Sequence, residues 1–292
     1  MPFNKRTYFV VDVFTERALE GNPLAVFPDG ASFSDEEMQS VARELNLSET
    51  VFVQPATRSD CVVRLRIFTP ARELLFAGHP TVGSSFVLLR EGLAKGDRFL
   101  LEEGVGPVPV RVESGDRPLI WLTTPPIQFE QTFDRTIAAQ ALGLSIDNLL
   151  DPLPQLVSAG NPFIFVALRD RAAVDRAWLD SSGMRRFEGD QAALSGVFVF
   201  APTEQGAYSR MFGPNHGISE DPATGSATGP LAAYMLRHQL VAGDAGHRFI
   251  SEQGTKMSRR SILHIQLNGK DGVNGIEIGG HVTPFARAEL EF

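Results

Sequence analysis

The stretch GNPLAVF at residues 21–27 returns as GNPFIFV at residues 160–166. Four further pairs keep the same order along the chain: residues 47–53 with 194–199, 66–70 with 210–214, 79–85 with 221–227, and 98–104 with 248–254. The offset between partners runs from 139 residues (160 minus 21) to 150 (248 minus 98), a spread that small loop insertions explain. Two halves of one architecture are therefore predicted.

The two copies agree at glycines, prolines and apolar positions, but they differ where a side chain could do chemistry. Glu49 stands opposite Gly196, and His79 stands opposite Asp221. If the halves pack about a pseudo-twofold axis, the two Pro-x-x-Gly-Ser segments meet at the interface, which is a favoured place for a small-molecule cleft. The residues that differ between the copies are therefore the candidates for catalysis.

Length, charge and cysteine content narrow the class of protein. A chain of 292 residues suits two domains of roughly 140 residues, each large enough to bury its own core. The net charge of −8 and the absence of a Lys/Arg run argue against a nucleic-acid partner. Cys61 is the only cysteine, and no apolar stretch approaches about 18 residues. We expect a cytoplasmic protein without an internal disulfide, a signal core or a membrane span.

Short strands, punctuated by Gly, Pro and Asp, dominate each half. Two helices, at residues 81–89 and 225–236, are apolar on most sides and are therefore predicted to be buried. A buried helix among short strands, found twice, predicts an α+β fold of two pseudo-symmetric domains. Each domain is a β-barrel-like sheet around a central helix. The first is predicted to span residues 1–124, with 284–292 as a strand that returns to it, and the second to span 125–283.

The starts of these helices, at residues 78–80 and 221–223, present free backbone N–H groups and a positive dipole end, so both can hold a carboxylate. A separate helix is predicted after Ser34, because Ser34 and Glu37 form a capping box. That helix delivers the chain to Glu49, which then lies at a helix-to-strand junction. Such junctions commonly carry functional side chains on a rigid support.

Four motifs in order make the chain similar to a known family. They are Gly21-Asn22-Pro23, NLSET at residues 46–50, FAGHP at 76–80 and EDPATGSA at 220–227. With them the chain resembles the phenazine-biosynthesis isomerase family, often called PhzF-like, from about Tyr8 to the C-terminus. The resemblance implies the diaminopimelate-epimerase-like fold, with the active site between two similar domains, and a homodimer. It also implies an enzyme without cofactor or metal that moves a proton on a small acid, typified by the isomerisation of trans-2,3-dihydro-3-hydroxyanthranilate.

The resemblance also implies roles for individual residues. Glu49 occupies the position of the family's acid/base, and His79 and Asp221 occupy positions of substrate-contacting and proton-handling groups. The substrate carboxylate is implied to bind to the backbones of Gly78 and Gly225 and to the Ser226 hydroxyl. Related epimerases and racemases of this fold use two cysteines at the helix starts. Because Cys61 lies elsewhere, a two-thiol racemase mechanism is excluded.

Each candidate also has a plain structural interpretation. Outside its motif, Glu49 reads as a surface glutamate, because glutamates are mostly exposed. His79 can serve as a structural helix-start residue, and Asp221 is a natural N-cap for the helix that follows. Gly225 and Ser226 suit a tight turn as well as they suit anion binding. The motif and the Gly196 counterpart favour the catalytic interpretation of Glu49.

A metal centre finds little support in the sequence. Glu49, His79 and Asp221 have ligand types that a metal accepts, but their wide separation supplies no positive support. The remaining histidines show no metal-ligand spacing and are interpreted as structural or exposed: His216, His238, His247, His264 and His281. We therefore predict neither a metal nor a cofactor.

The sequence thus predicts a proton-shuttling isomerase for a small cyclic or amino or hydroxy acid, with Glu49 as its acid/base. Two alternatives stay open at this point. One is an epimerase or racemase of the same fold that uses carboxylate and imidazole in place of thiols. The other is a non-catalytic protein that binds a small acid. The motifs define a site for proton transfer and leave the substrate, and any part in phenazine biosynthesis, undetermined.

Overall fold

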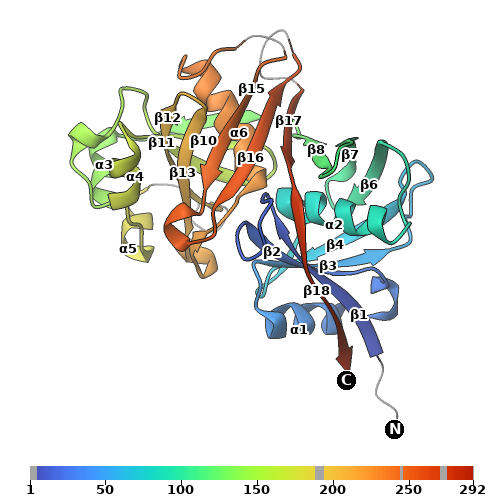
Figure 1. The fold of residues 1–292 in the computed structure, drawn as a ribbon. Coiled ribbons are helices and arrows are strands. Elements are labelled where there is room, and N and C mark those ends of the chain that lie inside the picture. The colour runs from blue at the N-terminus through green and yellow to red at the C-terminus, as the bar shows by residue number, and fades with distance from the viewer. Residues whose placement is uncertain (1–4, 188–193, 244–245, 270–274, 292) are drawn as a thin grey trace. The chain divides into compact units, whose positions relative to one another are not determined.

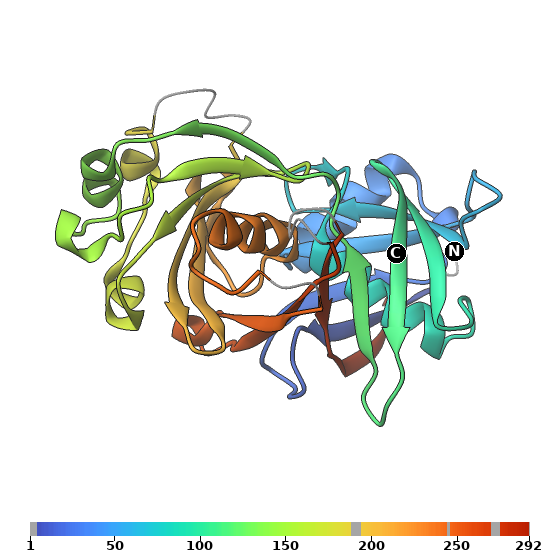
Figure 2. The same cartoon turned by 90° about the horizontal axis from the view of Figure 1, so that it is seen from above.

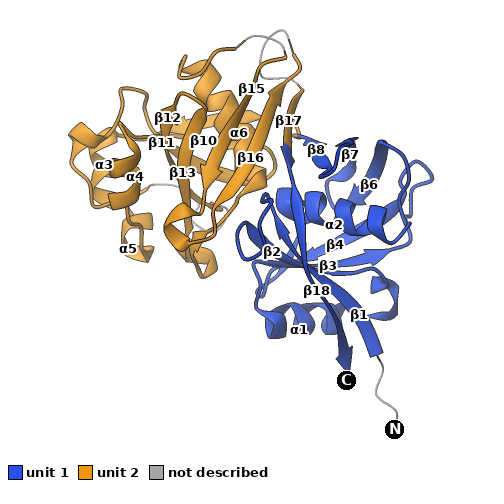
Figure 3. Ribbon diagram, viewed as in Figure 1, with its two compact units in different colours: residues 1–123, 279–292 blue, residues 124–278 orange. Residues whose placement is uncertain are grey.

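The computed structural model describes residues 5–187, 194–243, 246–269 and 275–291, and the chain divides into two compact units. Unit 1 contains residues 1–123 and 279–292, and unit 2 contains residues 124–278 (Figure 3). Both units combine helices with strands, so the predicted α+β class is confirmed. Among the described residues, no helix is long and apolar enough to cross a membrane.

Unit 1 is a mixed sheet that contains both antiparallel and parallel strand pairs (Figure 1). The pairs β2/β3 and β4/β6 are parallel, and the other pairs are antiparallel. In order of pairing the strands are β18 (Val282–Glu291), β1 (Lys5–Val13), β2 (Asn22–Phe27), β3 (Glu49–Gln54), β4 (Val63–Phe68), β6 (Arg98–Glu103), β7 (Gly106–Glu113) and β8 (Leu119–Thr123), with β5 (Glu73–Leu74) paired to β4.

Unit 2 repeats this pattern. Here β11/β12 and β13/β15 are the parallel pairs. The strands are β9 (Gln128–Thr132), β10 (Gln155–Ser158), β11 (Pro162–Ala167), β12 (Gly196–Thr203), β13 (Gly206–Gly213), β15 (Arg248–Gln253) and β16 (Ser261–Leu267), with β14 (Ile218–Asp221) paired to β13. β17 (Ile276–Gly280) carries the chain out of unit 2. Since the run from β10 to β16 matches the run from β1 to β7 in direction and order, the predicted internal duplication is confirmed.

A buried helix fills each unit, as predicted. In unit 1, α2 (Gly78–Arg90) packs on β1, β2, β3 and β8, and ten of its thirteen residues are buried. In unit 2, α6 (Gly225–Arg237) packs on β10, β11 and β16 and is equally buried; Figure 2 shows it enclosed by the strands. At Gly83 a Cβ atom would come within 2.6 Å of a Leu24 methyl carbon. The missing side chain therefore lets α2 approach β2 closely.

The other helices lie outside the strands. α1 (Asp35–Leu45) begins with the predicted capping box, because the Ser34 hydroxyl accepts from the Glu37 amide and the Glu37 carboxylate accepts from the Ser34 amide. In unit 2, α3 (Arg135–Ala141), α4 (Arg171–Arg176) and α5 (Ser181–Met184) each begin after an aspartate that caps the first turn. Single 3-10 turns complete the elements: η1 (Gly30–Ser32), η2 (Ile146–Asn148), η3 (Pro214–His216) and η4 (Thr255–Met257).

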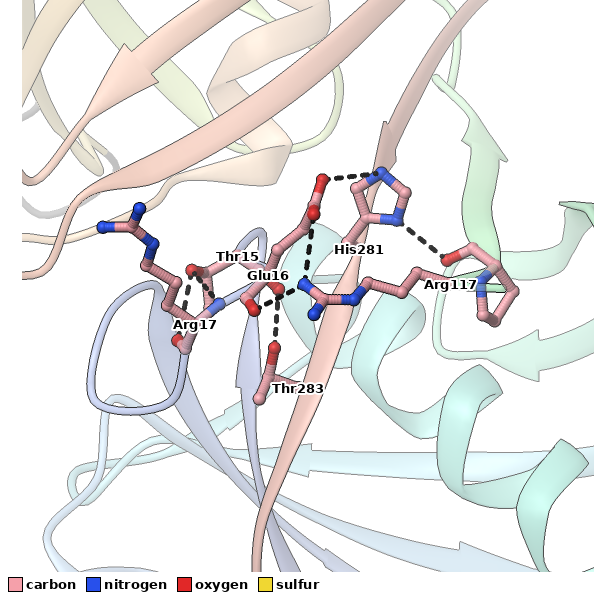
Figure 4. Close-up of polar contacts among 7 residues, drawn as sticks. Thr15, Glu16, Arg17, Arg117, His281 and Thr283 are labelled. Carbon is pink, nitrogen blue, oxygen red and sulfur yellow. Dashed lines mark hydrogen bonds and ion pairs between the residues drawn. The ribbon is translucent and has the colours of Figure 1, made fainter. Parts of the chain in front are cut away.

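β18 returns the chain to unit 1, where it pairs with β1 from Lys5 opposite Glu291 to Val13 opposite Val282. His281 sits just before this strand, and Figure 4 shows it between two partners of unit 1. Its Nε2 lies 3.5 Å from a Glu16 carboxylate oxygen, and its Nδ1 lies 3.2 Å from the carbonyl oxygen of Pro118. His281 thus has a structural role, in line with the interpretation of the histidines outside the motifs.

Candidate active site

Glu49 is the first residue of β3, and its backbone pairs with Leu24 of the parallel strand β2. Asn46, directly after helix α1, has the left-handed conformation with φ 50°, which turns the chain toward β3. The Glu49 side chain is 14% exposed. The carboxylate is therefore partly desolvated, which the predicted acid/base role requires.

His79 is the second residue of α2 and lies against Glu49. Its Nε2 is 3.1 Å from Oε2 of Glu49, and its side chain is 4% exposed. Burial lowers the pKa of His79 to about 3, since a charged imidazole loses its hydration in the core. The imidazole is therefore neutral at neutral pH.

Asn22 contacts the other nitrogen of the His79 ring. Its amide nitrogen Nδ2 lies 3.4 Å from Nδ1 of His79, and Asn22 is fully buried. An amide nitrogen can only donate, so Nδ1 of His79 accepts and the neutral ring carries its proton on Nε2, facing Glu49. The preceding Gly21 has φ 70°, and a Cβ atom there would lie 2.4 Å from the Val13 carbonyl oxygen. Only glycine fits this turn.

The starts of the two central helices differ from all other described α-helix starts. α1, α3, α4 and α5 have side-chain caps, but Ala77 before α2 and Thr224 before α6 supply none. The first-turn N–H groups from Gly78 and from Gly225 onward therefore lack a side-chain acceptor of this kind. Such uncapped starts suit an anionic ligand.

Asp221 ends β14 in unit 2 and is 6% exposed. Its carboxylate accepts from the Thr224 hydroxyl at 2.5 Å. Gln253 supports the same turn, because its amide nitrogen donates to the Asp221 carbonyl at 2.8 Å and its amide oxygen accepts from the Thr224 N–H. The interpretation of Asp221 as the N-cap was wrong: α6 begins only at Gly225, with Thr224 in the N-cap position.

The pairing of residues within the repeat also needs correction. Because α2 begins at Gly78 and α6 at Gly225, the counterpart of His79 is Ser226 and not Asp221. The offset is 147 (226 minus 79), the same as for Glu49 and Gly196 (196 minus 49). Alignment on the shared Pro-x-x-Gly-Ser pattern had paired the second turn of α2 with the first turn of α6. The segment 221–223 is an approach to the helix and not its first turn.

The predicted site residues thus form two groups. Unit 1 brings Glu49 and His79 into contact beside the start of α2 at Gly78. Unit 2 places Asp221 three residues before Thr224, with Gly225 and the half-buried Ser226 as the first residues of α6. Asn22 lies in the first of the four motifs, but its contact with His79 could not be predicted from the sequence. No group of three or more His, Cys, Asp or Glu that could hold a metal ion occurs in the described part of the chain.

Comparison with known proteins agrees with this architecture. The family model for phenazine biosynthesis-like proteins matches residues 11–288. A trans-2,3-dihydro-3-hydroxyanthranilate isomerase from Pseudomonas aeruginosa is 36% identical over 282 residues, which cover 96% of this chain and 97% of that protein.

Two solved structures show the same fold. One, described as a predicted epimerase from Pseudomonas aeruginosa, has a TM-score of 0.84 and 34% identity, and covers 98% of this chain and 99% of its own. The other, a hydroxyproline epimerase from Agrobacterium vitis, has a TM-score of 0.70 at 14% identity, covering 100% of this chain and 92% of its own. The predicted epimerase-type fold is therefore confirmed.

Proposed function

Since the chain belongs to the phenazine biosynthesis-like protein family, we propose that it is an isomerase that moves a proton on a small carboxylic acid, with Glu49 as acid/base. The observation that carries the proposal is the contact of Glu49 with a buried, neutral His79 at the uncapped start of α2. A partly desolvated carboxylate beside an N–H donor can accept a proton and give it back.

The proposed reaction needs one proton and no electron acceptor. The Glu49 carboxylate takes a proton from a carbon next to a conjugated system, and the electron pair of that C–H bond spreads into the conjugated system. The protonated Glu49 then returns the proton to another carbon of the same molecule, so that atoms and charge balance. Nε2 of His79 lies 3.1 Å from a Glu49 oxygen without the angle of a hydrogen bond, and at this distance its N–H dipole favours the carboxylate form.

We propose that the substrate carboxylate binds at the uncapped helix starts. Backbone N–H groups near Gly78 and Gly225 and the Ser226 hydroxyl supply the donors, and they also stabilise negative charge that spreads toward the carboxylate during proton transfer. Asp221 is proposed to contact polar groups of the same substrate, as the sequence resemblance implies. This part of the proposal is independent of the Glu49 and His79 pair and is tested separately below.

The proposed substrate is trans-2,3-dihydro-3-hydroxyanthranilate or a close analogue, because relatives at 33–36% identity are named for its isomerisation. An epimerase is the second candidate, since an epimerase shares the fold. A mechanism with one base at each helix start is less suited to this chain. His79 has Ser226 as its counterpart, and a serine hydroxyl is a poor base unless another group activates it.

A first test concerns the orientation of His79. Asn22→Asp replaces the donor at Nδ1 with an acceptor, so we expect the imidazole proton to move to Nδ1 and kcat to fall about tenfold to a hundredfold through misplacement of the catalytic pair. Nitrogen NMR of labelled histidine reads the tautomer directly, before any assay. An unchanged tautomer together with an unchanged kcat would show that Asn22 does not orient the ring.

A second test concerns the carboxylate site in unit 2. Ser226→Ala removes one proposed donor to a charged group, so KM for the anionic substrate should rise about tenfold, and kcat should fall by a smaller factor because the hydroxyl also stabilises developing charge. Steady-state kinetics with trans-2,3-dihydro-3-hydroxyanthranilate measure both constants. Ser145→Ala, at the exposed start of η2, serves as the control. A KM equal to wild type would exclude the hydroxyl from substrate binding.

A homodimer and a cytoplasmic location remain proposals carried by the family resemblance. Light scattering coupled to size exclusion measures the oligomeric state in solution. Neither proposal affects the proton-transfer chemistry, which rests on groups of this chain.

A further inference from the structure

Glu103, the last residue of β6, is a buried carboxyl group that the proposed reaction does not use. The residue is 4% exposed, and its Oε2 atom has no hydrogen-bond partner. Its Oε1 atom lies 2.6 Å from the Thr81 hydroxyl, in the first turn of α2, and the backbone N–H of Ala77 also donates to the carboxyl group. The Glu103 carboxyl group therefore contacts the start of α2, the helix that carries His79.

The charged groups on the surrounding elements are engaged elsewhere. Among the described residues, no cation forms an ion pair with Glu103. The charged and titratable residues of the neighbouring strands and of α2 have other partners. Glu102 accepts from the backbone of Thr57 and Arg58, and Arg64 of β4 lies opposite Glu102. Arg66 of β4 pairs with Asp35 and Glu73, and His79 contacts Glu49 and Asn22. A buried carboxyl group without a cation favours its neutral form.

The hydrogen bonds of Thr81 give an independent reason for a neutral Glu103. The Thr81 hydroxyl lies 2.8 Å from the Ala77 carbonyl oxygen as well as 2.6 Å from Glu103. A hydroxyl has one hydrogen, and a carbonyl oxygen can only accept. Both contacts are satisfied together when Thr81 donates to Ala77 and a protonated Glu103 donates to Thr81.

The second half of the molecule has a permanently neutral side chain at this position. The repeat pairs residues 98–104 with 248–254, so the counterpart of Glu103 is Gln253. Gln253 accepts from the N–H of Thr224, as Glu103 accepts from the N–H of Ala77, and each of these acceptors serves the N-cap residue of a central helix. Gln253 also donates to the hydroxyl of the N-cap residue Thr224, whereas a protonated Glu103 would donate to Thr81, four residues after the N-cap residue Ala77. The partners differ, but in both units a neutral side chain that can donate and accept suits this position.

We propose that Glu103 is a positioning residue that acts as a neutral carboxylic acid, and that its ionisation weakens binding of the substrate carboxylate at the start of α2. The second clause rests on the proposed function; the first does not. A negative charge beneath the first turn opposes the helix dipole's attraction for an anion and repels the substrate. It also favours a charged His79, which alters the pair with Glu49. KM should therefore rise, and activity should fall, as the pH increases and Glu103 ionises.

Burial raises the pKa of Glu103 to about 8, so this loss lies just above neutral pH. The same shift has a consequence for stability. A folded state that keeps the proton to a higher pH than the unfolded chain is most favoured below the unfolded pKa, near 4.5. Its advantage is lost as pH rises to about 8. Buried, neutral His79 has the opposite effect up to about pH 6.5, because the unfolded chain binds a proton there that the folded chain does not. The unfolding constant therefore grows, by up to about tenfold per pH unit, between about pH 6.5 and 8.

The experiment compares wild type with Glu103→Gln and, as a control, Glu102→Gln. Carbon NMR of protein labelled at the glutamate carboxyl carbons identifies the Glu103 signal by its absence in Glu103→Gln. We expect this signal to titrate near pH 8 and the pH-dependent growth of the unfolding constant to disappear in Glu103→Gln alone. Titration below about pH 6, in the usual range of a glutamate, overturns the proposal whatever the activity.

Kinetics with trans-2,3-dihydro-3-hydroxyanthranilate test the second clause. In wild type and Glu102→Gln, KM should rise about tenfold per pH unit above pH 8, and in Glu103→Gln this rise should be absent. If the signal titrates near pH 8 but the KM profile of Glu103→Gln matches wild type, the link to substrate binding is wrong. If no variant turns over this substrate, the NMR and unfolding results still decide whether Glu103 is neutral.

Discussion

Glu49→Gln should lower kcat for trans-2,3-dihydro-3-hydroxyanthranilate by about a thousandfold and leave the fold intact. General acid–base catalysis contributes about 10²–10⁴-fold, and a glutamine keeps the shape of the side chain but cannot take up the proton. The contact with His79 is kept, because glutamine can place an amide oxygen where the carboxylate oxygen lay. KM should therefore change much less than kcat.

The matched control for this variant is Glu44→Gln. Glu44 lies on α1, five residues before Glu49, and is exposed. It should keep wild-type kinetics, and both variants should show the wild-type unfolding midpoint within error. Retention of most activity by Glu49→Gln on the true substrate would remove Glu49 from the chemistry, even if the protein proves to be an isomerase.

Arg210→Met should cost about 3–5 kcal/mol of unfolding free energy, the largest stability effect that we expect from one substitution. Arg210 of β13 is 4% exposed and forms a bidentate pair with Glu220, at 2.9 and 2.7 Å. It also donates to the carbonyl oxygens of Val174 and Asp175 in α4 and to that of Ala177, the residue after this helix, at 2.7 Å. Methionine leaves the buried Glu220 carboxylate and these carbonyl groups without their donor.

The loss should extend to activity, because Glu220 directly precedes Asp221 in β14. Urea unfolding measures the free energy, and Arg58→Met provides the control. Arg58 pairs with Asp60 on the surface with 50% of its side chain exposed, so its removal should cost less than about 1 kcal/mol. Equal effects of the two variants would show that the Arg210 pair contributes no more than a surface pair.

The repeat in the sequence was enough to predict two α+β halves with a central helix in each. The apolar letters of α2 and α6 indicate burial on all sides, and burial is what the structure shows. The register of the helices was not predictable from letters alone. Pro80 and Pro222 sit at different points of their turns: Pro80 is the third residue of α2, whereas Pro222 precedes α6 by three residues. Identical residues therefore matched non-equivalent positions.

Some residues of the candidate site could be predicted from the sequence, and others could not. The motifs identified Glu49 and His79, and the structure brings these two into contact. Asn22 and Glu103 were missed as functional groups because their importance lies in contacts across the fold. Asn22 reaches a residue 57 positions away, and Glu103 reaches one 22 positions away. The sequence shows that Glu103 in one half is replaced by Gln253 in the other. This difference points to a neutral Glu103 only once the structure shows that both side chains contact the N-cap residue of a central helix.

The most direct test of proton transfer at Glu49 is deuterium incorporation from heavy water into trans-2,3-dihydro-3-hydroxyanthranilate, followed by mass spectrometry with wild type and Glu49→Gln side by side. A proton that passes through the Glu49 carboxyl group can exchange with solvent. We predict isomerised product that carries deuterium with wild type, and neither isomerisation nor exchange with Glu49→Gln. Isomerisation by Glu49→Gln at the wild-type rate, with the same deuterium content, would contradict the assignment of Glu49 as the acid/base.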